Sequence, residues 1–93
     1  MSEMMLFTGT GNPALSEKIA ERLGKNLGSI QIQRFSDGEI HVMVEESVRG
    51  DDVFIVQSMP TPVNEHLMEL LIMIDACRRA SARQITAIVP YFG

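Results

Sequence analysis

The sequence is poor in the residues that mark several functional classes. Its 93 residues include no tryptophan and a single cysteine, Cys77, so no disulfide can form within the chain; in a helical run this cysteine is most simply a small buried apolar residue. Acidic residues outnumber basic ones by twelve to eight, which leaves no basic field to attract a nucleic acid. The longest uncharged apolar stretch, residues 70–74, is far shorter than the ~20 residues of a membrane span. We therefore expect a cytoplasmic protein that contacts neither nucleic acid nor membrane.

Runs of apolar residues predict several β-strands. Continuous apolar runs at 4–7 and 53–56 are typical of strands covered on both faces, and the run at 85–89 predicts a further strand. Within residues 30–44, apolar and polar side chains alternate on either side of Asp37-Gly38. Alternation around a strong reversing signal predicts a β-hairpin with one buried face.

Two helices are expected between these strands. The first begins at Pro13 after an Asn12 N-cap and ends at Gly24 or Gly28, and the second runs from about Asn64 to Ala80. The order β-α-β-β-β-α-β predicts an α/β fold with an open, mostly parallel sheet that contains the hairpin. On the second helix we expect a buried apolar stripe formed by Leu67, Leu70, Leu71, Ile74 and Cys77.

The turn of the predicted hairpin contains more functional side chains than a chain reversal requires. Arg34-Phe35-Ser36-Asp37-Gly38-Glu39 gathers an aromatic ring and two carboxylates around a glycine that accepts positive φ. One interpretation is a recognition loop presented to a ligand. The other is a solvated turn with Phe35 folded back onto the core.

A glycine loop follows the first predicted strand. Residues 9–14 satisfy the pattern G-x-G-x-x-A at the start of a helix, which is the dinucleotide fingerprint. In a dinucleotide-binding unit the second strand ends in an acidic residue and leads to another helix, whereas here it ends at Arg34 and runs into a hairpin. We therefore interpret this loop as a plain connection into a helix N-terminus.

The two histidines do not have the spacing of metal ligands. His41 and His66 lie 25 residues apart, and neither has a second histidine, cysteine or carboxylate at a usual ligand spacing. Both histidines are therefore most simply ordinary surface or helix-start residues.

Several short motifs follow one another along the chain, and they are Phe35–Glu39, Glu46–Val53, Gln57-Ser58, Asn64–Leu70, Arg78–Ala82 and Val89–Gly93. The sequence closely resembles, over nearly its whole length, the N-terminal part of ribose-phosphate diphosphokinase, also called phosphoribosyl pyrophosphate synthetase. The resemblance implies a phosphoribosyltransferase-like fold and a magnesium-dependent transfer of pyrophosphate from ATP to ribose 5-phosphate. It also implies that residues 1–93 are a truncated first domain without the second one, and that the whole protein is a homo-oligomer of the hexamer-of-dimers type.

The resemblance assigns roles to two groups of residues. The family's catalytic lysine and arginines and its magnesium ligands lie beyond Gly93, so we expect no catalytic residue and no metal ligand in this chain, and no activity from the 93 residues alone. Residues that match the family's adenine site for ATP are Phe35, Asp37, Gly38 and Glu39. Residues that match its regulatory site for phosphate or ADP are Ser47, Arg49 and Ser81.

Two other functions stay open from the sequence. The chain could come from a non-catalytic, synthetase-associated regulatory subunit, which would keep the same fold and interfaces. It could also be a free-standing nucleotide-binding module. The sequence that follows Gly93 discriminates between an active enzyme and a regulatory subunit, because an active enzyme needs a basic loop and an acidic segment for ribose phosphate.

Overall fold

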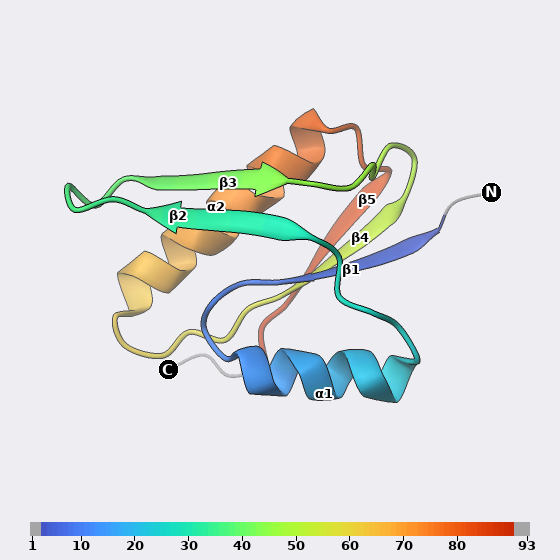
Figure 1. The fold of residues 1–93 in the computed structure, drawn as a ribbon, viewed down its shortest axis with the longest axis horizontal. Helices are drawn as coiled ribbons and strands as arrows, with labels where there is room; N and C mark the ends of the chain where they lie inside the picture. Colours follow the sequence, from blue (N-terminus) through green and yellow to red (C-terminus); the bar gives the residue numbers. More distant parts are fainter. Residues whose placement is uncertain (1–2, 91–93) are drawn as a thin grey trace.

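The computed structural model describes residues 3–90, in which a parallel sheet carries one helix on each face and a hairpin lies over one of these helices (Figure 1). The predicted order of strands and helices is confirmed. In chain order the elements are β1 (Met4–Thr8), α1 (Pro13–Leu23), β2 (Ile30–Arg34), β3 (Ile40–Val44), β4 (Asp52–Val56), α2 (Val63–Arg79) and β5 (Gln84–Ile88).

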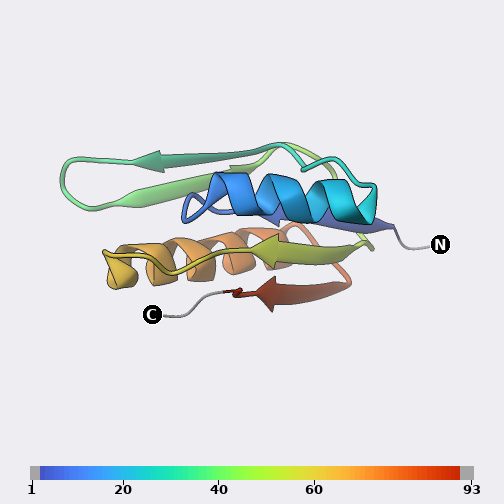
Figure 2. The same ribbon diagram turned by 90° about the horizontal axis from the view of Figure 1, so that it is seen from below.

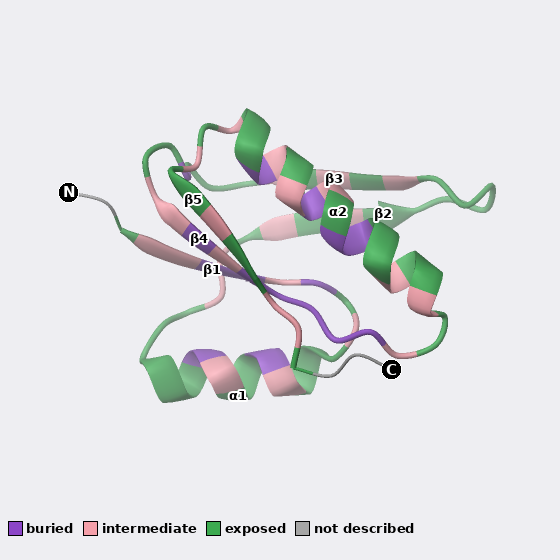
Figure 3. Ribbon diagram, turned by 180° about the vertical axis from the view of Figure 1, so that it is seen from behind, coloured by how far each residue is buried: buried purple, intermediate pink, exposed green. Residues whose placement is uncertain are grey.

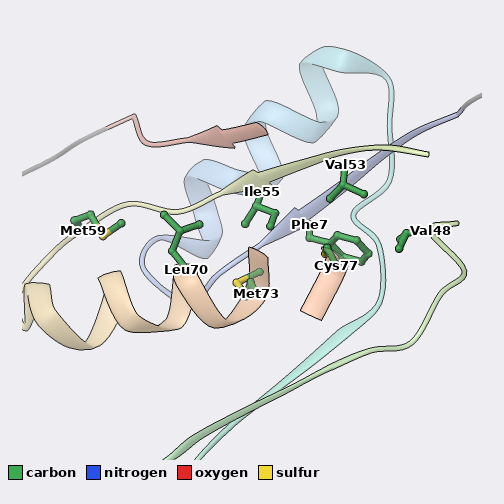
Figure 4. Packing of buried hydrophobic residues seen from close by; sticks show 8 residues of the cluster. All are labelled: Phe7, Val48, Val53, Ile55, Met59, Leu70, Met73 and Cys77. Carbon is green, nitrogen blue, oxygen red and sulfur yellow. The ribbon is translucent and has the colours of Figure 1, made fainter. Parts of the chain in front are cut away.

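Strand β4 is the centre of the three-stranded parallel sheet, whose order is β1-β4-β5. Successive side chains of a strand point to opposite faces, so β4 buries Val53 and Ile55 on one face and Val56 on the other. On the first face the core includes Leu70 of α2 (Figure 4), and on the second it includes Ala20 of α1. The prediction that residues 53–56 form a doubly covered strand is confirmed.

The hairpin is a sheet of its own. Strands β2 and β3 pair in antiparallel register, with Ile32 opposite Val42 and Arg34 opposite Ile40, and they form a separate two-stranded sheet. The expectation that the hairpin belongs to the parallel sheet is therefore wrong. The reason is its one-sided burial: Ile32 and Val42 pack against the core on the α2 side, whereas Gln33 on the other face is exposed. Such a half-covered ribbon suits the outside of a helix layer better than the interior of a doubly covered sheet.

The buried face of α2 also differs from the expected stripe. Leu67 and Leu71 are exposed, Leu71 to 50%, so their predicted burial is wrong. Apolar residues occupy nearly every position from 67 to 74, and such a helix has no single face that its periodicity could define. Contacts with the sheet and the hairpin select the face instead. The residues that α2 buries are Glu69, Leu70, Met73 and Cys77.

The ends of α1 confirm the predicted capping signals. The Asn12 side chain accepts a hydrogen bond from the Leu15 backbone N at 3.1 Å, and the helix ends at Gly24, which has a φ of 67°. Within residues 3–90, neither helix combines the length and the apolar content of a membrane-spanning helix. The motif Tyr91–Gly93 lies outside the described residues.

Candidate functional site

The tip of the hairpin is a closed turn from Phe35 to Glu39. The Phe35 backbone N donates to Glu39 O at 2.9 Å, and Gly38 N donates to Phe35 O at 2.9 Å. Gly38 has a φ of 89°, a conformation that glycine adopts without steric cost. The Asp37 carboxylate accepts a hydrogen bond from the Glu39 backbone N at 3.0 Å, which stabilises the turn from within. The predicted reversal at Asp37-Gly38 is thus confirmed.

Two side chains of the tip cluster with His41 of β3. The Phe35 ring is 47% exposed, and it meets the His41 ring edge-to-face with centroids 4.9 Å apart. His41 Nε2 lies 2.5 Å from Glu39 Oε1. Phe35 is therefore not folded back onto the core, which was the second interpretation of this turn. The tip offers an aromatic surface and carboxylate oxygens at one exposed place.

The tip projects from the rest of the described chain. Figures 1 and 2 show it extending beyond the helices, on the side of the molecule at which the parallel strands end. Figure 3 shows its residues exposed. Residues 3–90 would therefore cover a ligand bound here on one side only.

A buried carboxylate lies at the carboxyl ends of β1 and β4. Glu69 of α2 has no exposed surface. Its partners come from separate segments: Thr10 follows β1, Gln57 follows β4, and Arg34 ends β2. One side chain therefore joins α2 to the glycine loop, the sheet and the hairpin. The four hydrogen bonds that its oxygens accept come from Thr10 N (2.6 Å), Thr10 Oγ1 (2.8 Å), Gln57 Nε2 (2.7 Å) and Arg34 Nη2 (2.6 Å).

Opposing effects set the charge of Glu69. Burial by itself raises the pKa of this carboxyl, because it disfavours the charged form. The hydrogen bonds from Thr10, Gln57 and Arg34 together outweigh burial and lower the pKa of Glu69 below its usual value. The Arg34 guanidinium, whose side chain is 32% exposed, also binds Glu65 at 3.1 Å. Glu69 is thus an anion at neutral pH with a cation directly beside it.

The glycine loop packs closely against the segment after β4. A Cβ atom at Gly9 would lie 2.3 Å from Gln57 Oε1, and one at Gly11 would lie 2.2 Å from Ser58 O. The Gly11 backbone N donates to Gln57 Oε1 at 3.0 Å. These glycines therefore have a packing role, because no larger residue fits the contact without displacing its neighbours. That role accounts for the G-x-G pattern without a dinucleotide.

The two segments that carry Ser47, Arg49 and Ser81 meet beside the start of β4. Gly50 N donates a hydrogen bond to Ser81 O at 3.0 Å. Ser81 has a φ of 69°, which is uncommon for a residue other than glycine. All three residues are exposed. The structure thus brings the turn that contains Ser47 and Arg49 next to Ser81.

The histidines stand apart from each other and have separate partners. His66 Nδ1 lies 3.0 Å from Pro60 O and 2.9 Å from Pro62 O at the start of α2. In the described part of the chain, no three histidine, cysteine, aspartate or glutamate side chains gather where they could hold a metal ion. The magnesium implied by the resemblance therefore fits no group of residues between 3 and 90.

A comparison with protein families matches residues 4–93 to the N-terminal domain of ribose phosphate pyrophosphokinase. The chain belongs to this family. Ribose-phosphate pyrophosphokinase 2, chloroplastic, of Arabidopsis thaliana is 62% identical over 92 residues, which are 99% of this chain and 23% of that protein. Ribose-phosphate pyrophosphokinase 1 of Spinacia oleracea is also 62% identical over 92 residues, which are 99% of this chain and 27% of that protein. The chain spans about a quarter of the length of these pyrophosphokinases.

Solved structures show the same fold. Phosphoribosylpyrophosphate synthetase from Mycobacterium smegmatis is 46% identical and superimposes with a TM-score of 0.95 over 98% of this chain and 30% of that chain. Purine phosphoribosyltransferase from Pyrococcus horikoshii Ot3 is only 12% identical, yet it superimposes with a TM-score of 0.66 over 99% of this chain and 69% of that chain. The expected phosphoribosyltransferase-like α/β fold is confirmed.

The sequence analysis did not predict the contact between Glu69 and Arg34. One signal was available, because Glu69 lies four residues before Met73 and eight before Cys77, positions that share one face of a helix. A carboxylate among apolar residues on that face indicates a buried charge, which needs a partner. The partner itself was not visible, since Arg34 is distant in sequence.

Replacing Glu69 by glutamine tests the charge of this buried group. Glutamine keeps the shape but turns an NH₂ group toward donors, and a buried donor left unpaired costs about 1–3 kcal/mol. Because folding lowers the pKa of Glu69, its charge stabilises the fold above the usual carboxyl pKa, and this stabilisation is lost as the pH falls through the lowered value. In urea unfolding, the stability gap between the wild-type chain and Glu69→Gln should therefore narrow from about pH 7 to about pH 3.

Glu17→Gln provides the control, because Glu17 lies exposed on α1. It should leave the free energy of unfolding within about 0.5 kcal/mol of the wild-type value at neutral pH. If the difference in the free energy of unfolding between the wild-type chain and Glu69→Gln stays constant from neutral to acidic pH, Glu69 is not ionised in the folded chain.

Proposed function

We propose that this chain is the adenine-recognising part of an enzyme that transfers pyrophosphate from ATP to ribose 5-phosphate, giving 5-phosphoribosyl 1-pyrophosphate. Membership of the pyrophosphokinase family supports the reaction class. The observation that carries the proposal is the exposed tip, at which Phe35, Asp37 and Glu39 come together around Gly38. The chemistry of pyrophosphate transfer and its magnesium ion belong to residues other than those described here.

The tip has the chemistry that adenine recognition requires. Phe35 offers a flat apolar ring on which a purine can stack. His41 holds Oε1 of Glu39, so that Oε2 can accept a hydrogen bond from the exocyclic amino group of adenine. Guanine carries an oxygen acceptor at that position, and two acceptors cannot form a hydrogen bond. Because Asp37 also accepts the Glu39 backbone hydrogen bond that stabilises the turn, Glu39 is the residue whose replacement tests the discrimination of ATP from GTP without disturbing the turn.

The position of the tip supports a site shared between subunits. Its residues are exposed, and it extends beyond the other elements of the described chain (Figure 2). A purine on Phe35 would need a second wall to leave water. We propose that a neighbouring subunit of a homo-oligomer supplies that wall, together with the sites for ribose 5-phosphate and the phosphates of ATP. The cytoplasmic location stays a prediction, and several relatives are named as chloroplastic proteins.

The proposal is testable in a chimera in which residues 1–93 replace the matching segment of the Spinacia oleracea pyrophosphokinase 1. Glu39→Ala removes one charged hydrogen-bonding partner, which is worth about 1.5–3 kcal/mol or a roughly ten- to hundredfold change in affinity. The KM for ATP should rise by that factor and the preference for ATP over GTP should narrow, while the KM for ribose 5-phosphate stays unchanged.

Glu17→Ala on α1 is the matched control and should leave all three quantities unchanged, because Glu17 is exposed and lies outside the tip. If Glu39→Ala alters neither the ATP KM nor the preference over GTP, the tip does not read adenine.

We further propose that Ser47, Arg49 and Ser81 bind a regulatory anion, phosphate or the diphosphate of ADP. The contact between Gly50 and Ser81 brings their segments together on the exposed surface. Two hydroxyls and a guanidinium are suited to an oxyanion, because the planar guanidinium donates charge-assisted hydrogen bonds.

In the chimera, Arg49→Ala should raise the phosphate concentration needed for activation by roughly ten- to hundredfold. The KM for ATP should change much less, because Arg49 is not part of the tip. Arg22→Ala, which removes an exposed arginine of α1, is the control. An unchanged phosphate dependence in Arg49→Ala would show that Arg49 has a structural role only.

A further inference from the structure

We propose that the ion pair between Arg34 and Glu69 sets the orientation of the hairpin tip, so that both are positioning residues for the nucleotide. This inference rests on the proposed role of the tip in binding adenine. Arg34 is the last residue of β2 and immediately precedes Phe35. Its Nη2 atom donates to Glu69 Oε1 at 2.6 Å and its Nη1 atom to Glu65 at 3.1 Å. The guanidinium thus attaches the base of the tip to two successive turns of α2.

Glu69 is a rigid anchor for this attachment. It has no exposed surface, and donors from Thr10 and Gln57 hold its oxygens at 2.6–2.8 Å. Gln57 directly follows β4, and Thr10 lies two residues after the end of β1. The position of the carboxylate is therefore fixed by the sheet, and Arg34 transmits that position to the hairpin.

Near the tip, the described residues show little else that could fix its orientation. The apolar side chains through which the hairpin packs on the core are Ile30, Ile32, Val42 and Val44. The strand pair closest to the tip is Arg34 with Ile40, and Ile40 is not among the residues that pack against that core. The backbone hydrogen bonds of the turn and the one to Asp37 join tip residues to one another, and Glu39 contacts His41 of β3, which also belongs to the hairpin. They fix the shape of the tip but not its direction relative to the sheet.

The same contacts exclude a direct role for this pair in the chemistry. Glu69 is buried, and both of its oxygens already accept hydrogen bonds. Arg34 faces two carboxylates, so its charge is neutralised and it is poorly suited to clamp the phosphates of ATP. Its effect on the nucleotide must pass through Phe35 and the rest of the tip.

The orientation of the tip can be measured with spin labels on the 93-residue chain, independently of nucleotide. Ser36→Cys labels the tip and Lys18→Cys labels α1; both sites are exposed, whereas the native Cys77 is buried and unreactive. The labelled chain is diluted with unlabelled chain so that only distances within one chain are recorded. Arg34→Ala should widen the distribution of distances between the labels, and Arg34→Lys, which keeps the charge but lacks the fork, should widen it less.

Arg83→Ala is the matched control. Arg83 donates two hydrogen bonds to Asp52 at 2.9 and 3.2 Å, at the end of the sheet where β4 and β5 begin. Its removal deletes a similar ion pair without touching the hairpin, so the distance distribution should stay as in the wild type. Far-ultraviolet circular dichroism checks whether each variant is folded. If Arg34→Ala does not fold, the comparison of Arg34→Lys with the wild type decides whether Arg34 orients the tip.

Kinetics in the chimera supply the functional readout. Arg34→Ala should raise the KM for ATP by roughly tenfold, and it should leave the KM for ribose 5-phosphate unchanged. A merely structural role would lower the amount of active enzyme, and hence kcat, without this selective change in KM. An unchanged distance distribution, or a widened one with an unchanged ATP KM, overturns the positioning role.

The two proposals fail separately. If Glu39→Ala raises the ATP KM while Arg34→Ala alters neither distances nor KM, the adenine site stands and the positioning role is overturned. If Glu39→Ala has no effect on ATP, the adenine site is overturned, and so is the functional part of the positioning role, whatever the spin labels show.

Discussion

The burial of one carboxylate, Glu69, connects the functional parts of this chain. A buried charge is stable only when its oxygens are hydrogen-bonded and a cation is near. Glu69 meets this requirement with donors from the glycine loop, the end of β4 and the hairpin. Satisfying its charge therefore fixes three segments that are far apart in sequence, and it places them together at the carboxyl edge of the sheet, where α/β folds bind their ligands.

The base and the tip of the hairpin differ in their contacts. Its base packs apolar side chains on the core, whereas its tip exposes Phe35 and Glu39 beyond the fold. Such an arrangement leaves the proposed recognition residues free to reach a ligand that another part of the protein holds. It also makes orientation critical, because a small rotation at the base displaces the tip. The ion pair between Arg34 and Glu69 lies at this junction, where the proposed positioning role would limit that rotation.

Local patterns in the sequence predicted the elements but not their partners. The runs at 53–56 and the reversal at Asp37-Gly38 identified a doubly covered strand and a hairpin, because these features depend on neighbouring residues. The separate hairpin sheet and the exposure of Leu71 could not be predicted, since both depend on which distant surfaces meet. The tip residues stand out through their motif, whereas the role proposed for Arg34 and Glu69 depends on a contact across 35 positions of the chain.

A mutant cycle between Arg34 and the tip tests most directly whether the ion pair acts on the nucleotide through the tip. The ATP KM is measured in the chimera with Arg34 or Arg34→Ala, each with the native tip and with Phe35 and Glu39 both replaced by alanine. If Arg34 only orients the tip, Arg34→Ala should raise the KM roughly tenfold with the native tip and by less than about twofold when both tip side chains are absent. An equal increase in both backgrounds would contradict the account, because it would show that Arg34 acts on ATP independently of Phe35 and Glu39.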